Sequence, residues 1–352
     1  MSVLLVIQIL AVLVTIGTFI PLVRCEYWII RAWDFPRLQL FALGVTLFLA
    51  LLYYSSQGVD ELAHHAVLVL LGVALAALAW WIRPFTKLHP KELLDGTGES
   101  AIKLLVSNVL MTNRQSEGLI ALVRELKPDI FVALETDQWW VDRLAELADD
   151  YPHAVEVPQD DTYGMLMRSR IPLIDPKVKR LVRESIPSIH CKIRMKNGTL
   201  VDLYALHPRP PYPAEDTSSC DRDAELLIVG KQVEKHKGPA IVLGDLNDVA
   251  WSRTTLLFQK TSRLLDPRIG RGHYNTFSAD KWWMRWPLDH VFISDHFKLR
   301  KLMRLPYIGS DHFPIFVDFS FEPEGKHEQE APAQEEGDRE EANEKIAKAL
   351  DQ

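Results

Sequence analysis

The sequence has 352 residues, of which 47% are hydrophobic and 25% are charged, and this balance excludes an intrinsically disordered chain. The formal net charge of −7 comes from residues 322–352, where eleven Asp and Glu residues outnumber four Lys and Arg residues. The rest of the chain is close to neutral, which does not favour strong binding to nucleic acid by charge alone. Three scattered cysteines exclude a disulfide framework and a CxxC zinc site: Cys25, Cys191 and Cys220.

Three long apolar stretches occupy the first 85 residues, at about 2–23, 38–54 and 63–82. The first is long enough to cross a bilayer as a helix. Aromatic residues gather near the ends of the stretches, as they do at membrane interfaces: Trp28, Trp33, Tyr53, Tyr54, Trp80 and Trp81. A buried core helix is the alternative for any one stretch, but three in one block favour a membrane domain. We predict three transmembrane helices within residues 1–85, with the lipid bilayer as their partner.

Basic residues in the loops predict the orientation of these helices. The first loop carries three arginines, the second loop carries no Lys or Arg, and Arg83, Lys87 and Lys91 follow the third stretch. Cytoplasmic loops are enriched in basic residues. The amino terminus is therefore expected outside, and everything after residue 82 in the cytoplasm.

Three further segments follow the membrane domain. Residues 86–99 contain Pro90, Gly96 and Gly98 and predict a linker. From 100 to 321, strand and helix patterns alternate, which predicts mixed sheets with helices outside them. Residues 322–352 are poor in apolar side chains and rich in Glu, Gln and Pro, so we expect an acidic disordered tail, with at most a frayed helix at 343–350.

The most informative stretch is Gly244-Asp245-Leu246-Asn247-Asp248, which follows the apolar run at 240–243. Four apolar residues ending in Gly predict a buried strand, and the carboxyl ends of such strands are where open α/β sheets bind ligands. Asp245 and Asn247 are two residues apart, so in an extended segment both point the same way. They suit a phosphate and an attacking water, although Gly, Asp and Asn also form turns.

Other predicted strands also end in polar residues of useful types: Asn108, Glu135, His207, the Asp289-His290 pair and the Asp311-His312 pair. Charges at such positions cost stability unless they are paired or bind a ligand. Carboxylates and an amide without cysteine suit a hard cation such as Mg²⁺. Histidine beside aspartate suits acid–base chemistry or contact with phosphate. The set therefore predicts a metal-assisted phosphoester hydrolase.

The order of these motifs resembles the endonuclease/exonuclease/phosphatase superfamily, which includes deoxyribonucleases, apurinic/apyrimidinic endonucleases, neutral sphingomyelinases and inositol polyphosphate 5-phosphatases. The resemblance covers about residues 100–321. Within the superfamily, the chain looks most similar to bacterial members that are anchored in the membrane. Its motifs are Leu-His-Pro at 206–208, Gly-Asp-Leu-Asn at 244–247, Leu-Asp-His at 288–290 and Ser-Asp-His-Phe-Pro-Ile at 310–315. It implies a four-layer α/β sandwich, two packed mixed β-sheets flanked by helices, with the site at one edge.

By position, the resemblance implies that Glu135 is the principal Mg²⁺ ligand, with Asp311 and Asn108 contributing and Mn²⁺ as an alternative ion. His312 is expected to contact the scissile phosphate or act as base, oriented by Asp289. The remaining assignments concern water and phosphate: Asp245 positions or deprotonates the water, Asn247 binds phosphate, and His207 contacts a phosphate oxygen or assists the leaving group. Many members have Gln before the metal-binding Glu, whereas this chain has Leu134.

Substrate features are sparse. Asn108 and Arg170, which ends a Gly-x-x-x-x-Ser-Arg-like strand, are candidates for phosphate contact, and Trp283 in the aromatic run 281–286 is a candidate for stacking on bases or meeting lipid. Core packing is the alternative for these aromatic residues. We predict a phosphodiesterase or nuclease in a bacterial inner membrane. The alternatives are a phospholipid or phosphoinositide phosphoesterase and a catalytically inactive scaffold; no protein partner is identifiable.

Overall fold

The computed structural model describes residues 2–351, and its strands form two sheets. One sheet contains β1 (Ala101–Asn108), β2 (Ile130–Leu134), β3 (His153–Val157), β4 (Met165–Ser169), β10 (Phe297–Arg304) and β11 (Ile315–Phe321), in the spatial order β10-β11-β1-β2-β4-β3. The other contains β5 (Ile174–Lys179), β6 (Ser188–Arg194), β7 (Leu200–Leu206), β8 (Ala240–Asp245) and β9 (Asp289–Ile293), in chain order.

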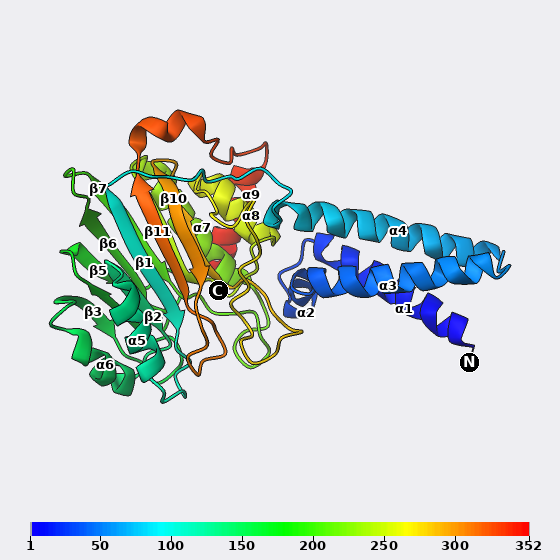
Figure 1. Cartoon of the computed structure of the whole chain (residues 1–352), viewed down its shortest axis with the longest axis horizontal. Helices are drawn as coiled ribbons and strands as arrows, with labels where there is room; N and C mark the ends of the chain where they lie inside the picture. Colours follow the sequence, from blue (N-terminus) through cyan, green and yellow to red (C-terminus); the bar gives the residue numbers. More distant parts are fainter. Residues whose placement is uncertain (1, 352) are drawn as a thin grey trace.

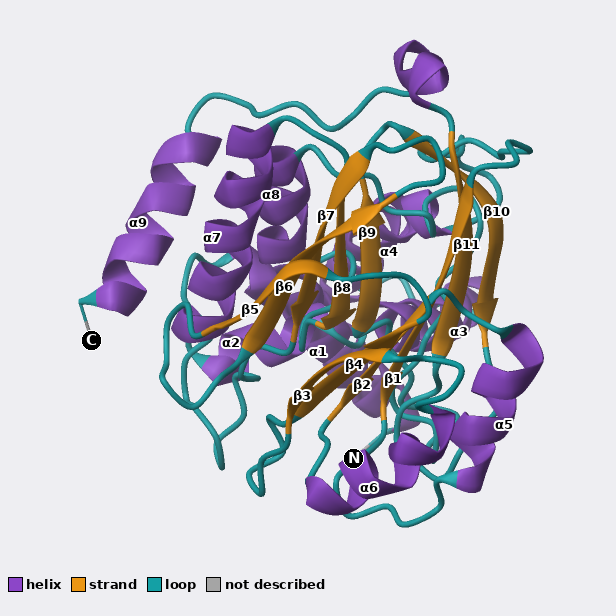
Figure 2. Ribbon diagram, turned by 90° about the vertical axis from the view of Figure 1, so that its left-hand side faces the viewer, coloured by secondary structure: helices purple, strands orange, loops and turns teal. Residues whose placement is uncertain are grey.

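Helices cover the outer faces of both sheets, which completes four layers (Figure 2). Helices α5 (Glu117–Leu126) and α6 (Gln138–Leu144) pack on the six-stranded sheet. Helices α7 (Cys220–His236) and α8 (Arg253–Ser262) pack on the five-stranded sheet. The predicted α/β sandwich is therefore confirmed.

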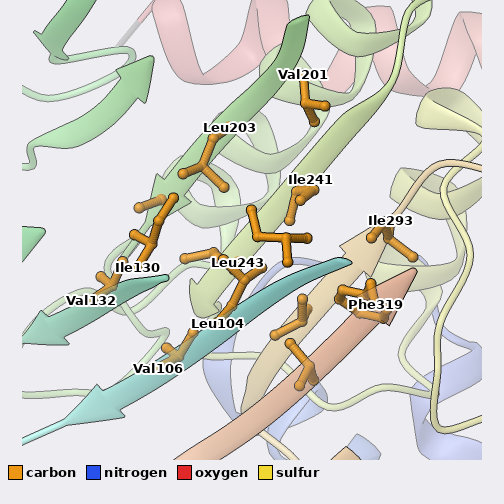
Figure 3. Packing of buried hydrophobic residues seen from close by; sticks show 14 of the residues in the cluster. Leu104, Val106, Ile130, Val132, Val201, Leu203, Ile241, Leu243, Ile293 and Phe319 are labelled. Atoms are coloured by element: carbon orange, nitrogen blue, oxygen red, sulfur yellow. The ribbon is translucent and has the colours of Figure 1, made fainter. Parts of the chain in front are cut away.

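Alternation along each strand explains this layering. In β1, Leu104 and Val106 point into the core between the sheets, while Leu105 points toward the helices. In β8, Ile241 and Leu243 point inward and Val242 outward. Successive strand residues point to opposite faces, so strands buried on both sides read as continuous apolar runs. Figure 3 shows the side chains of both sheets meeting in this central core.

Two parallel strand pairs determine where polar residues gather. Strand β1 pairs in parallel with β2, so Asn108 lies beside Leu134, the residue before Glu135. Strand β7 pairs in parallel with β8, so Leu206 lies beside Gly244. Both pairs deliver their carboxyl ends to one edge of the sandwich. The residues that follow these ends consequently converge.

Three long helices project from one side of the sandwich: α1 (Val3–Phe19), α3 (Arg37–Ser56) and α4 (Leu62–Ile82), with the short α2 (Trp28–Arg31) before α3 (Figure 1). Their mutual core includes Leu47, Leu51 and Leu71. Apolar side chains on their outer faces stay exposed, such as Leu49 at 60% and Val69 at 65%. Each helix is long and apolar enough to cross a membrane, as predicted.

The linker and the tail are more ordered than the sequence suggested. In the predicted linker, Leu93 is fully buried in the core between the sheets, and Gly96 N–H donates to Leu299 O at 2.8 Å. The expected disordered tail forms α9 (Asp338–Leu350), which lies beside α7 (Figure 2). Ion pairs that the sequence does not reveal hold it there, including Lys345 to Asp223 at 2.7 Å and Arg253 to Glu341.

Candidate active site

Asn108 connects the two sheets at the edge where the polar strand ends converge. Its side-chain amide donates to Glu135 Oε1 at 2.7 Å and to Asp245 Oδ2 at 3.1 Å, while its Oδ1 accepts from Leu110 N–H at 3.0 Å. Glu135 comes from the six-stranded sheet and Asp245 from the five-stranded sheet. Both side-chain polar atoms of Asn108 thus have protein partners, and its amide bridges the two carboxylates. Its contact with a metal or a phosphate stays a prediction.

The carboxylates of this site crowd one another. Burial raises the pKa of Glu135 to about 7 against the lowering effect of the Asn108 hydrogen bond, and the Asp311 and Asp245 carboxylates add to the rise. Burial likewise raises the pKa of Asp311, which lies near Asp245. Converging carboxylates disfavour their own ionised forms unless a positive charge lies among them. The site therefore has the electrostatics of a cation-binding centre.

His312 supplies one positive charge. Its Nδ1 lies 2.8 Å from Asp289 Oδ2, and its Nε2 lies 3.5 Å from Asp245 Oδ2. Asp289 and Asp245 are themselves cross-strand neighbours in β9 and β8. Burial lowers the pKa of His312, but these carboxylates outweigh burial and raise that pKa to about 10. The ring therefore lies between two carboxylates that favour its protonated form. The role of Asp289 in orienting it, which the resemblance implies, stays a prediction.

Ser310 fixes the segment that carries Asp311 and His312. Its hydroxyl donates to Asn108 O at 2.8 Å and accepts from His312 N–H at 3.0 Å. The same segment lies just before β11, which is antiparallel to β1. The end of β1 and His312 are thereby joined through the Ser310 hydroxyl.

His207 and Asn247 complete the group. His207 Nε2 lies 3.9 Å from Asp245 Oδ2, and burial lowers the His207 pKa, so this ring is neutral. Asn247 has a left-handed backbone with φ of 50°, and its side-chain amide donates to Pro208 O at 3.0 Å. Glu135 also has a left-handed backbone, with φ of 62°. Non-glycine residues held in this region store strain, which concentrates at functional sites.

Two unpartnered oxygens test the fit to a metal. Asp311 Oδ1 and Asp289 Oδ1 are buried without a hydrogen-bond partner, so both have lone pairs free for a ligand. Asp245, Asp289 and His312 have ligand atoms within 4.8 Å of one another. The resemblance implies Glu135 and Asp311 as metal ligands, and this pair stays a prediction. Their hard oxygens fit a divalent cation such as Mg²⁺.

Two predicted substrate contacts lie away from this cluster. Arg170 follows β4, which is antiparallel to β2, and its N–H donates to Asp129 O. Asp129 precedes β2 whereas Glu135 follows it, so Arg170 lies at the opposite edge, about 17 Å along the strand. The Arg170 prediction is therefore wrong, because an antiparallel neighbour carries its last residue away from the site. Trp283 lies in a loop beside the start of α3, where its main-chain O accepts from the Gln39 amide at 3.0 Å, and the residue is 57% exposed.

The structure adds residues that the sequence analysis missed. Arg222 in α7 is buried, and its Nη1 donates to Asn247 O at 2.9 Å while its other nitrogens contact Asp223. The Phe277 ring lies 4.9 Å from that of His312. Tyr163 packs on His207 at 5.5 Å between ring centroids. An arginine in the first turn of a helix gave a weak signal for Arg222, and nothing in the local pattern singled out the aromatic rings.

Comparison with known proteins identifies the family of this chain. The model of the Endonuclease/Exonuclease/phosphatase family matches residues 105–312. The catalytic domain of human Nocturnin, solved with a bound sulfate anion, is similar with a TM-score of 0.52 and 18% identity, over 66% of this chain and 97% of that one. An endonuclease/exonuclease/phosphatase from Beutenbergia cavernae is similar with a TM-score of 0.51 and 17% identity, over 64% of this chain and 72% of that one.

A humanized D. rerio TDP2 has a TM-score of 0.51 and 15% identity, over 63% of this chain and 100% of that one. No curated protein matches the chain. At these identities the solved structures establish a likeness in fold, while the family match covers more than half of the sequence, from β1 to His312. The chain belongs to the endonuclease/exonuclease/phosphatase family.

Proposed function

We propose that this protein is a membrane-anchored, divalent-metal-dependent phosphoesterase that hydrolyses phosphodiester bonds. The observation that carries the proposal is the convergence of Glu135, Asp245 and His312 at one edge, tied together by Asn108 at 2.7 and 3.1 Å and by Asp289 at 2.8 Å. Family membership supports hydrolysis of phosphoesters as the reaction class. An arrangement of buried carboxylates, one imidazolium and one neutral imidazole suits an anionic substrate and an attacking water.

Glu135 and Asp311 would hold the cation, and Asn108 would keep the Glu135 carboxylate in place. When bound, such an ion supplies positive charge to the phosphate oxygens and to the leaving group. The preferred ion is Mg²⁺, with Mn²⁺ as the alternative, since both take oxygen ligands.

The protein's own groups have separate tasks in this proposal. Asp245 accepts a hydrogen bond from the attacking water and takes its proton, because its carboxylate faces both histidines. His312 stays protonated and donates to a nonbridging phosphate oxygen, since Asp289 maintains its charge. Neutral His207 donates a hydrogen bond to the leaving oxygen, which takes its proton from solvent water as it departs. Hydrogen bonds to Arg222 and Pro208 hold Asn247 in its left-handed turn. In this position Asn247 helps to orient the phosphate.

The proposed domain plan takes its bounds from the sequence. Residues 1–85 form the membrane domain, 86–99 connect it to the sandwich, and 100–321 carry catalysis. The basic residues after the third helix favour a cytoplasmic catalytic domain in a bacterial inner membrane. A reporter fused after Leu350 tests this topology: activity of a reporter that works only in the cytoplasm is expected, and activity of one that works only outside would overturn it.

The reaction is tested with the full chain in detergent and a soluble diester, bis(p-nitrophenyl) phosphate. We expect hydrolysis with Mg²⁺ or Mn²⁺ and none with EDTA. Asp245→Asn should lower turnover by roughly 10²- to 10⁴-fold, the usual contribution of a general base. Asp318→Asn is the matched control, since Asp318 is a buried carboxylate of β11 that contacts Arg300 rather than the site. Turnover that survives both EDTA and Asp245→Asn would refute the proposal.

A further inference from the structure

A short hairpin forms one wall of the site. We call residues 277–286 the rim loop; they include the sequence Lys281-Trp282-Trp283-Met284-Arg285-Trp286. Phe277 N–H donates to Trp286 O at 3.0 Å, and Ser278 N–H donates to Met284 O at 2.9 Å. Arg285 donates across the hairpin to Ser278 O and Ala279 O. These bonds give the loop one defined shape.

The base of the rim loop is attached to the catalytic segment. Ala279 N–H donates to Asp311 O at 2.6 Å, and Phe313 N–H donates to Thr276 O at 2.9 Å. The Phe277 ring lies 4.9 Å from that of His312. The loop therefore borders the proposed metal ligand and the phosphate-binding imidazolium directly.

The rim loop is attached to the apolar helices at its tip and at its base. Gln39 lies in the first turn of α3, and its side-chain amide donates to Trp283 O at 3.0 Å. The ring of Phe35, just before α3, meets Trp286 edge-on at 5.4 Å between centroids. If α3 crosses a bilayer, a main-chain atom bonded to its first turn lies at the membrane interface. Figure 1 shows loops of the sandwich reaching the end of the helical domain near α2.

The outward face of the tip is aromatic. Trp282 is 80% exposed and Trp283 is 57% exposed, so neither side chain belongs to a protein core. Lys281 between them and the site is also exposed. On the neighbouring helix α4, Trp80 in the last turn is 65% exposed. Tryptophan prefers the interface of a bilayer, where the ring is buried and its N–H stays wet, and lysine is attracted to anionic headgroups.

We propose that the rim loop lies in the membrane interface and that the site takes the phosphoester headgroup of a membrane lipid. This inference rests on the proposed function and names its substrate class. A lipid headgroup at the interface would lie beside Trp282 and Trp283. These residues belong to the same hairpin as Phe277, whose ring packs on His312. Binding of nucleic acid bases by the same rings is the competing outcome, and the loop's attachment to Gln39 argues against it, because the bilayer would occupy that face.

The location of the loop is tested without using activity. In the full chain with Cys25→Ser, Trp282→Cys carries an environment-sensitive fluorophore after reconstitution into vesicles of phosphatidylglycerol and phosphatidylethanolamine. The native Cys191 and Cys220 are buried and should not label. Leu200→Cys is the control, since Leu200 is exposed at the start of β7, about 20 Å from its site end. Blue-shifted emission and quenching by nitroxide lipids at 282 alone are expected; aqueous emission at both positions overturns the proposal.

The substrate is tested by comparing rates. Phospholipid vesicles, single-stranded DNA and bis(p-nitrophenyl) phosphate are offered in parallel to the wild type, Trp282→Glu and Leu200→Glu. The ratio of vesicle to soluble-diester turnover should fall about tenfold in Trp282→Glu, because an interfacial indole is replaced by a charge, and should not fall in Leu200→Glu.

The outcomes separate the two proposals. Soluble-diester turnover with no vesicle turnover overturns the lipid inference and leaves the proposed function intact. A loss confined to DNA turnover in Trp282→Glu assigns the loop to bases and also overturns the inference. Absence of turnover on every substrate, with Mg²⁺ and a folded chain, refutes the proposed function, while the fluorescence result still decides where the loop lies.

Discussion

Gly244, the residue before Asp245, is expected to be irreplaceable even by alanine. A Cβ atom at this position would lie 1.9 Å from Leu206 O, and the backbone has φ of 142°. Real Cβ atoms do not approach a heavy atom within 3.0 Å, so β7 and β8 would have to separate by about 1 Å where they pair. Asp245 is the last residue of β8 and His207 follows β7, so the two side chains would move apart.

The cost has two parts. Forcing an extra methyl group into a packed core costs about 1–3 kcal/mol, and holding a non-glycine residue in a sparsely populated backbone region costs a further 1–3 kcal/mol or so. The free energy of unfolding of Gly244→Ala should fall by about 4 kcal/mol, which lowers Tm by about 8–16 °C for a domain of this size. A displacement of 1 Å at catalytic groups can also lower turnover about 10²-fold.

The assay compares Tm and diester turnover of Gly244→Ala with those of Gly238→Ala. Gly238 precedes the same strand, and the nearest atom to its added Cβ is 3.9 Å away, so this control should retain both properties. Turnover is measured below the Tm of both variants, where each remains folded. Equal Tm and turnover in Gly244→Ala and the wild type would refute the close approach of β7 and β8 as the reason for this glycine.

Three further predictions concern residues outside the catalytic cluster. Burial and the Asp221 carboxylate raise the pKa of Glu225 to about 8, so the folded state prefers the neutral acid. The free energy of unfolding should therefore fall by about 1.4 kcal/mol per pH unit as pH rises from about 4.5 to 8. Glu225→Gln should flatten this pH dependence in urea unfolding, and an unchanged slope would contradict the prediction. Lys345→Ala removes the 2.7 Å contact to buried Asp223 and should cost about 1–3 kcal/mol in the same assay. Arg170→Ala should change neither turnover nor, beyond about 0.5 kcal/mol, stability.

The sequence predicts the catalytic edge because strand geometry is a local property. Asp245 and Glu135 each follow a buried apolar run, and the parallel pairs β1–β2 and β7–β8 bring both ends to the same edge. Asp289 lies opposite Asp245 in an antiparallel pair, so it arrives there as the first residue of its strand. Apolar runs and the polar residues that end them placed these residues at strand ends, and their roles came from the resemblance to the family.

The failures come from long-range partners. Arg170 follows a buried strand, as Glu135 does, but that strand, β4, runs antiparallel to β2 and ends at the other edge of the sheet. The tail is polar in composition, yet its lysines and glutamates find partners more than eighty residues away, such as Arg253 with Glu341. Composition reports how much apolar surface a segment can bury, and it does not reveal ion pairs supplied by another segment.

Other long-range contacts connect the apolar helices to the residues beside Asp245 and Asp289. Trp251 Nε1–H donates to Asp34 O at 2.7 Å, and Trp251 lies in a buried cluster with Phe85 and Leu288, the residue before Asp289. Leu93 fills the core between the sheets from the segment that follows α4. A fragment that begins at residue 100 would expose these apolar surfaces and weaken the support behind β8 and β9. The helical segment is therefore part of the catalytic fold as well as its proposed anchor, and the geometry at Asp245 and Asp289 depends on the whole chain.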